Sequence, residues 1–172
     1  MDRFEINNKE IDERFDFRTI TQEEAEEAAE VERVCFPPNE ACSKEHMTER
    51  IKAASDLFMV AIDLKTGRIA GFLNGIATNE YDFRDEFFTD ADIHDPDGEN
   101  VMLLGLDIMP EYRKKGLARA LVYKYCKREK ERGRKRLKLT CLKEKVDMYA
   151  AFGLSDLGES ASEWGGEKWH EM

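Results

Sequence analysis

Long apolar runs and paired cysteines are both missing from this chain of 172 residues. No stretch approaches the ~18 apolar residues of a membrane-spanning helix, and the opening residues, MDRFEINNKE, are too polar for a secretory signal peptide. The four cysteines form no C-x-x-C pair and no framework spacing, so they indicate free thiols in a reducing compartment. We therefore expect a cytoplasmic protein that does not bind membranes.

Several common ligand-binding motifs are also absent. A P-loop requires G-x-x-x-x-G-K-[ST] and a dinucleotide fingerprint requires G-x-G-x-x-G, and neither occurs in the chain. Residues 90–97 gather four aspartates and a histidine, but their spacing does not fit the register of an EF-hand. We predict no metal site.

Charged residues are abundant and unevenly placed. They make up 37% of the chain, with a net charge of −10, yet residues 113–138 hold 13 Lys and Arg against 2 Glu. The acidic remainder disfavours uniform binding to nucleic acid, so we expect no nucleic-acid partner, and it favours attraction of a cationic substrate. A non-enzymatic module that binds nucleic acid through the basic segment is the weakest alternative.

The pattern of apolar residues and turns indicates one domain, residues 15–172, after a polar lead-in of residues 1–14. Capping signals and four-residue spacing predict helices over 21–34 and 46–55, from Gly116 onward, and over 144–152. Predicted strands cover 15–20, 57–64, 68–78, 101–109, 136–141, 154–160 and 168–172. This order favours an α/β or α+β fold, with a mixed, mostly antiparallel sheet of about six to seven strands and helices on both faces.

Residues 79–100 interrupt this pattern with an acidic tract that contains several aromatic residues. The tract is long for a connection between strands, which often signals a functional lid or a flexible loop.

The stretch from Val101 to Tyr125 organises the rest of the chain. It is predicted to form a buried strand, a turn beginning at Pro110, a basic loop and an amphipathic helix. A helix that starts after such a loop leaves backbone N–H groups without intrahelical partners, and its dipole favours negative charge there. The stretch therefore indicates a site for a phosphate-bearing cofactor.

The loop has the pattern R-x-x-G-x-A over residues 113–118, and Y-x-x-F-G follows at 149–153. With the preceding strand and the following helix, these motifs resemble the GCN5-related N-acetyltransferase (GNAT) superfamily. The resemblance implies a GNAT-like fold and acetyl-CoA as co-substrate, with its pyrophosphate on the loop. The cofactor contacts that it implies are Leu106, Asp107, Ile108, Arg113, Lys114, Lys115, Gly116, Leu117, Ala118, Arg119, Tyr149 and Phe152.

Further segments are similar to the arylalkylamine (serotonin) N-acetyltransferase branch. They are CFPPNEA at 35–41, the tract 79–100, Thr140-Cys141 and MYAAFG at 148–153. The vertebrate enzymes of this branch carry two histidines where this chain has Met102 and Leu104, so their proton route is missing here. Related insect enzymes use a glutamate in the loop that corresponds to residues 38–41, which Glu40 would supply.

The resemblance implies direct attack of an amine on the thioester in a ternary complex. An alkylamine with a pKa of about 10.4 is almost entirely protonated at neutral pH, so the reaction needs a base. Glu40, through a water molecule, is the first candidate base and Asp107 the second. A bulge near residues 106–108 would present backbone N–H groups to the thioester oxygen, and Tyr149 would protonate the departing thiolate.

Each of these residues also has a structural interpretation. Tyr149 could simply pack on an amphipathic helix, Glu40 could be a solvated loop carboxylate, and Asp107 could be a hydrogen-bonding group within its strand. The predicted activity is acetylation of a small arylalkylamine or other alkylamine by a monomer or homodimer. Acetylation of a peptide or protein amine is the alternative within the same fold.

Overall fold

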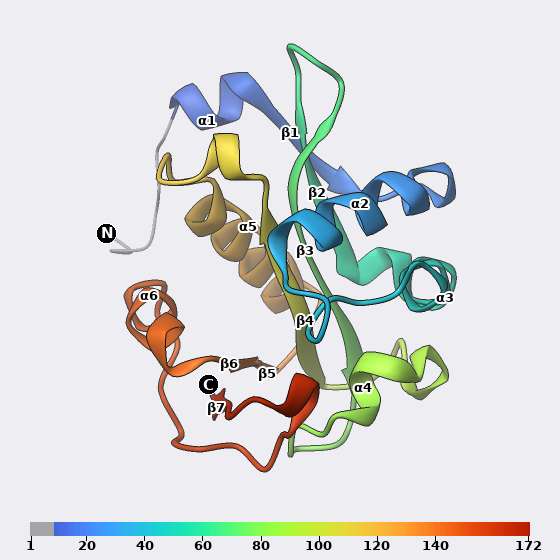
Figure 1. Ribbon diagram of the computed structural model, residues 1–172, viewed down its shortest axis with the longest axis vertical. Helices are drawn as coiled ribbons and strands as arrows, with labels where there is room; N and C mark the ends of the chain where they lie inside the picture. The colour runs from blue at the N-terminus through green and yellow to red at the C-terminus, as the bar shows by residue number, and fades with distance from the viewer. Residues whose placement is uncertain (1–8) are drawn as a thin grey trace.

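A five-stranded sheet lies at the centre of the computed structural model, which describes residues 9–172 (Figure 1). The sheet order is β1-β2-β3-β4-β5, and β6 and β7 pair separately. Pairing is antiparallel throughout, except that β4 and β5 are parallel. The strands are β1 Phe15–Thr19, β2 Phe58–Asp63, β3 Ile69–Thr78, β4 Asn100–Ile108, β5 Arg136–Lys138, β6 Thr140–Cys141 and β7 His170–Glu171. The predicted mixed, mostly antiparallel sheet is confirmed, with its six to seven strands divided between two sheets.

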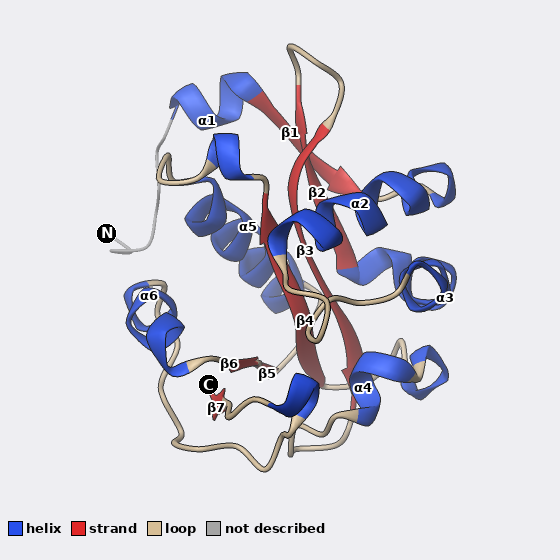
Figure 2. Ribbon diagram, in the orientation of Figure 1, coloured by secondary structure: helices blue, strands red, loops and turns tan. Residues whose placement is uncertain are grey.

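Helices cover both faces of the sheet, as predicted (Figure 2). On one face, α2 and α3 bury Ala28, Met47 and Ile51 against the sheet, and on the other face α5 buries Leu121 and Tyr125. The helices are α1 Lys9–Arg14, α2 Ala25–Cys35, α3 Lys44–Ala54, α4 Glu86–Thr89, α5 Leu117–Glu131 and α6 Val146–Ala151.

Local sequence signals explain where α2 and α3 begin. The N–H of Thr21 donates to the Glu24 carboxylate at 2.9 Å, which confirms the predicted capping box, although a short 3-10 turn precedes α2. The Ser43 hydroxyl accepts from the N–H of His46 at 3.1 Å and caps α3, which starts two residues earlier than predicted.

A bulge and an early separation distinguish β4 from the other strands. Asn74 of β3 pairs with Gly105 and Gly75 pairs with Leu103, so Leu104 is skipped in the register. The bulge therefore lies at Leu104 and not at residues 106–108, where the sequence interpretation placed it. Strand β5 pairs with β4 only from Asn100 to Met102, and beyond Met102 the edge of β4 that faces away from β3 is open.

The predicted strand 136–141 is split. Its first part pairs with β4, whereas Thr140–Cys141 turns away to pair with β7, because Leu139 and the C-terminal Met172 exchange backbone hydrogen bonds at 2.9 Å. The predicted strand 154–160 is wrong. That segment contributes one isolated bridge, Glu159 to His170, because a turn at Gly158, with a positive φ of 95°, interrupts any longer ladder.

The acidic tract 79–100 is packed against the body of the protein, so the interpretation as a flexible loop is wrong. It contains α4 and a 3-10 turn at Ala91–Ile93. Its aromatic side chains Phe83, Phe87 and Phe88 are buried against Met102. The aromatic residues within this polar tract therefore anchor it.

Residues 9–14, expected to belong to a polar lead-in, form α1 with Ile11 buried. Arg14 fastens this helix to the sheet through two hydrogen bonds of 2.8 and 2.9 Å to the buried Asp63 carboxylate. Tyr112, just before the basic loop, donates to the same carboxylate at 2.6 Å. The remainder of the predicted lead-in, residues 1–8, lies outside the described residues. Within residues 9–172, no helix has the length and apolar character to cross a membrane.

Glu129 of α5 is fully buried and holds the start of β5. Its carboxylate accepts from Arg128, Arg132 and Arg134 at 3.0–3.3 Å. Arg134 also donates to the Pro96 carbonyl at 3.0 Å, so one carboxylate connects the acidic tract to the turn that leads into β5.

We expect Glu129→Ala to lower the free energy of unfolding by about 2–4 kcal/mol, because it leaves the partly buried guanidinium groups of Arg128 and Arg134 without their counter-charge. Urea unfolding followed by circular dichroism measures this change. Glu131→Ala, in the same helix but exposed, is the matched control and should stay within about 0.5 kcal/mol of wild type. Equal stabilities of the two variants would contradict the assigned role of Glu129.

Candidate functional site

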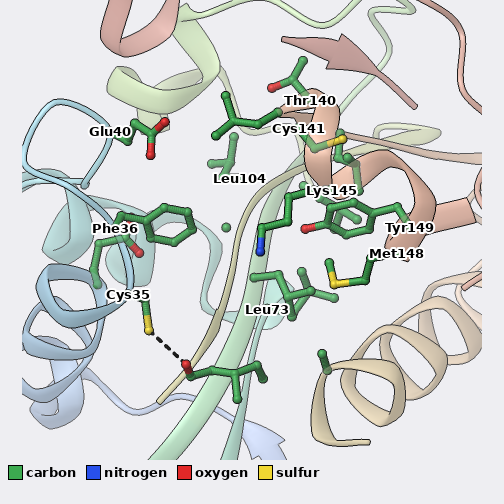
Figure 3. A pocket seen from close by; sticks show the side chains of 18 of the residues that line it. Cys35, Phe36, Glu40, Leu73, Leu104, Thr140, Cys141, Lys145, Met148 and Tyr149 are labelled. Carbon is green, nitrogen blue, oxygen red and sulfur yellow. Dashed lines mark hydrogen bonds between the residues drawn. The ribbon is translucent and has the colours of Figure 1, made fainter. Parts of the chain in front are cut away.

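A cavity of about 730 Å³ lies where β4 and β5 separate. One half is lined by α2, the loop that follows it and the C-terminal segment, and the other by the loop 113–119, β6 and α6. Figure 3 shows Phe36 and Glu40 on one side and Lys145, Met148 and Tyr149 on the other, with Leu104 of β4 between them. The bulge of β4 thus lies between the two halves.

The basic loop has the backbone shape of an anion site. Lys114 has a φ of 60° and Gly116 a φ of 88°, both left-handed, and Gly116 caps the N-terminus of α5. The first N–H groups of this 15-residue helix have no intrahelical acceptor and face the loop. The Arg113 side chain folds back and donates to the Ile108 carbonyl at 2.9 Å. Backbone N–H groups, rather than the Arg113 side chain, are therefore the donors that this loop offers to an anion.

The open edge of β4 presents further backbone groups to the cavity. The N–H of Met109 donates to Ala70 of β3 at 2.9 Å, so residue 109 faces the sheet. Because successive residues of a strand direct their backbone groups to opposite sides, those of Leu106 and Ile108 face the open edge. The Ile108 carbonyl accordingly accepts from Cys35 at 3.3 Å as well as from Arg113. The Leu106 and Ile108 N–H groups are thus directed toward the cavity.

Tyr149 directs its phenol into the cavity from α6 (Figure 3). Burial raises the pKa of this phenol well above its ordinary value, and the neighbouring Cys141 and Asp107 raise it further. The hydroxyl is therefore a proton donor at neutral pH. Phe152 packs edge-on against Tyr149, with ring centroids 6.1 Å apart, and helps to orient it.

Glu40 lies on the opposite side of the cavity from Tyr149 (Figure 3). Partial burial raises the pKa of its carboxyl above the ordinary value, and the negative charges of Glu167 and Glu144 raise it further. This part of the cavity is therefore acidic and suited to a cationic ligand.

The C-terminal segment fastens the loop that carries Glu40. The Trp164 indole donates to the Glu40 carbonyl at 3.0 Å, and the Asn39 amide donates to the Gly165 carbonyl at 2.9 Å. A Cβ at Gly165 would stand 2.6 Å from the Asn39 carbonyl oxygen, so only glycine permits this approach. The Trp164 ring stacks on Phe88 of α4 at 4.7 Å, which gives this half of the cavity an aromatic surface.

The structure brings most of the predicted site residues together. Leu106, Ile108, Arg113, Lys114, Gly116, Leu117, Ala118, Arg119, Tyr149, Phe152 and Glu40 all line the cavity. Lys115 and Asp107 do not: Lys115 is exposed to solvent, and Asp107 is fully buried behind the cavity surface, beside Glu32 and Arg50.

Glu32 and Arg50, which line the cavity, were missed from the sequence. Each is a charged residue on the apolar stripe of its helix: Glu32 follows the buried Ala28 by four positions, and Arg50 follows the buried Met47 by three. A charged residue on the apolar stripe of a helix is the sequence signal that would have identified them as candidate site residues. No group of three or more possible metal ligands occurs in the part of the chain that the structure describes.

A sequence model of the Acetyltransferase (GNAT) family matches residues 22–154. No curated protein matches the chain significantly. Among solved structures, a GphF GNAT-like decarboxylase in complex with isobutyryl-CoA has a TM-score of 0.71 at 16% identity, covering 91% of this chain and 96% of its own.

The structures of two N-acetyltransferases also resemble this chain. The ribosomal-protein-S18-alanine N-acetyltransferase of Escherichia coli has a TM-score of 0.66 at 14% identity, over 92% of this chain and 91% of its own. The glucosamine-6-phosphate N-acetyltransferase of Arabidopsis thaliana has a TM-score of 0.62 at 17% identity, covering 86% of this chain and 96% of its own. At these identities the structural likeness bears on the fold alone.

Proposed function

The chain belongs to the acetyltransferase (GNAT) family and is an acyltransferase, and we propose that it is a cytoplasmic enzyme that acetylates a small primary amine. The proposed donor is acetyl-CoA, and the acetyl group passes directly to the amine in a ternary complex. The observation that carries this proposal is a single cavity with an anion loop and a buried phenol on one side and an acidic, aromatic surface on the other.

The cofactor half suits a thioester of coenzyme A. The loop 113–119 and the first turn of α5 would bind the pyrophosphate through backbone N–H groups. The N–H groups of Leu106 and Ile108 at the open edge of β4 would stabilise the oxyanion formed when the amine attacks. Tyr149 would then protonate the thiolate that leaves.

The acceptor half suits an amine with an aromatic or other apolar body. Phe36, Phe88 and Trp164 supply a ring-lined surface, and Glu40 supplies negative charge. These features support an arylalkylamine-like substrate, as in the branch that the sequence resembles. A peptide or protein amine is the alternative acceptor, but the contacts of Trp164 and Asn39 close this half with the chain's own C-terminal segment.

The reaction also needs a group that removes a proton from the ammonium form of the substrate. Of the two bases predicted from the sequence, Glu40, acting through a water molecule, is the one that lies at the cavity. Asp107, the other candidate from the sequence, lies behind the cavity surface and would have to act through another group.

The proposal is tested by incubating the protein with acetyl-CoA and a panel of acceptors while free thiol is measured. The panel contains tryptamine-like amines, polyamines and lysine peptides. We expect the fastest thiol release with the arylalkylamines and identify the product by mass spectrometry. A preference for lysine peptides would favour the alternative, and failure to bind acetyl-CoA at about 1 mM would contradict the enzyme assignment.

We expect Gly116→Val to weaken acetyl-CoA binding by at least about tenfold, because a β-branched residue is strained at a φ of 88° and would displace the loop N–H groups. Isothermal titration calorimetry measures the affinity. Gly133→Val is the matched control, since Gly133 has a φ of 87° in an open turn beyond the other end of α5. Lys114→Ala and Lys115→Ala should each change the affinity by less than about threefold.

We expect Tyr149→Phe to lower kcat by about 10²-fold while acetyl-CoA binding is retained, because the ring still packs but no longer donates a proton. Steady-state kinetics with the preferred amine measure the loss. Tyr81→Phe, at an exposed tyrosine outside the cavity, should leave kcat unchanged. Undiminished turnover in Tyr149→Phe would remove this residue from the mechanism.

A further inference from the structure

Three polar side chains from three elements meet at Gly105 of β4, and a fourth, Arg50, joins them by donating to the Asn74 side chain at 3.5 Å. Glu32 comes from α2, Arg50 from α3, Asn74 from β3 and Asp107 from β4, and each is at most 5% exposed. Glu32, Arg50 and Gly105 line the cavity, whereas Asp107 lies directly behind them.

This cluster lacks several of the hydrogen bonds that buried polar groups normally make. Glu32 Oε1 accepts from the N–H of Cys42 at 3.1 Å, but Glu32 Oε2 and both oxygens of Asp107 have no donor among the described residues. Arg50 donates to the Phe88 carbonyl at 2.8 Å, while its Nε is likewise unpaired within residues 9–172. Buried atoms of this kind are rare in folded proteins and call for a ligand or a proton.

The unpaired oxygens converge on the space left by the missing side chain of Gly105. A Cβ built at Gly105 would lie 3.2 Å from Asp107 Oδ1, 3.3 Å from Asn74 Nδ2 and 3.8 Å from Glu32 Oε2. Gly105 directly follows the bulge at Leu104, next to the open edge where the thioester is proposed to lie. A small group bound above Gly105 would therefore contact Glu32 Oε2 and the reaction centre together.

The surroundings of Asp107 favour its protonated form. Burial, above all, raises the pKa of Asp107 well above its ordinary value, and the adjoining Glu32 carboxyl raises it further, against the opposing charge of Arg50. The Cys35 and Cys42 thiols beside the pair are neutral, because burial raises the pKa of each. Across the cavity, the Tyr149 phenol is also neutral.

We propose that Glu32 is the group that accepts the proton of the substrate ammonium, and that Asp107 positions Glu32. An N–H bond of the ammonium breaks, its proton forms an O–H bond with Glu32 Oε2, and the electron pair left on nitrogen forms an N–C bond with the thioester carbonyl, whose π electrons become the oxyanion. When the C–S bond then breaks, the thiolate takes the Tyr149 proton, and the second proton of the bound nitrogen returns to the Tyr149 oxygen. Before the transfer, Arg50 balances the single negative charge of the pair. The proton later leaves to solvent through the cavity, past Glu40. Glu40 itself attracts the cationic amine into the cavity. This inference rests on the proposed function.

The test is the pH dependence of kcat/KM in Glu32→Gln, with the preferred amine. At pH 7 we expect a loss of about 10²-fold. In this variant solvent must remove the proton, so kcat/KM should rise about tenfold per pH unit up to the pKa of the amine. In wild type, by contrast, kcat/KM should level off at a lower pH. Glu30→Gln, at an exposed position of the same helix, should retain the wild-type profile.

An amine that is already neutral at pH 7, such as trifluoroethylamine, separates proton transfer from a structural role. Glu32→Gln should be nearly as active as wild type on this substrate, because no proton needs to be removed before attack. A similar loss on both amines would overturn the proposal. Retained acetyl-CoA binding in Glu32→Gln shows that the fold is intact.

Asp107 is tested by infrared difference spectroscopy of the protein without substrate. We expect the wild type to show a protonated carboxyl band at neutral pH, which Asp107→Asn loses, and Asp107→Asn to shift the acidic limb of the pH–rate profile. Absence of the band from wild type would overturn the protonated state of Asp107 and with it the positioning role. If wild type acetylates no amine, the proposed function fails; if it does and Glu32→Gln has an unchanged profile, this inference alone fails.

Discussion

The separation of β4 from β5 after three paired residues is the constraint on which the site depends. A closed parallel pair would satisfy the edge of β4 with backbone hydrogen bonds and would leave no cavity. Instead, the bulge at Leu104 changes the register, and β6 is drawn toward β7 by the exchange between Leu139 and Met172. The open edge then faces a cavity that α6 lines from one side and the loop after α2 from the other. Two ligands can thus meet at one strand from opposite sides.

Electrostatics divide the two halves of this cavity. The loop 113–119 and the N-terminus of α5 provide a positive potential for phosphate without relying on the Arg113 side chain, which is held by the Ile108 carbonyl. Glu40, with the negative charges of Glu167 and Glu144 near it, makes the acceptor half negative. This division supports the proposed placement of a cationic amine in one half and an anionic cofactor in the other.

Much of the fold followed from the sequence because its signals are local. Apolar alternation in β1, apolar runs bounded by turn residues, the capping box at Thr21 and the glycine of the basic loop marked β1–β4, α2 and α5 to within a few residues. The errors arose where tertiary contacts prevailed over local pattern. The acidic tract is held by its buried phenylalanines, and the segment 154–160 runs beside β7 without forming a ladder.

The sequence by itself predicted the basic loop and Tyr149 as cofactor contacts, because the loop and its helix form one contiguous stretch and a specific spacing accompanies them, and both line the cavity. It predicted Glu40 and Asp107 as bases but could not show that one is partly exposed and the other fully buried, since burial is a property of the folded chain. Only the tertiary structure placed Asp107 behind the cavity surface and brought Glu32 and Arg50 to it from α2 and α3. Their chemistry depends on desolvation and on charges distant in sequence, and folding alone creates those conditions.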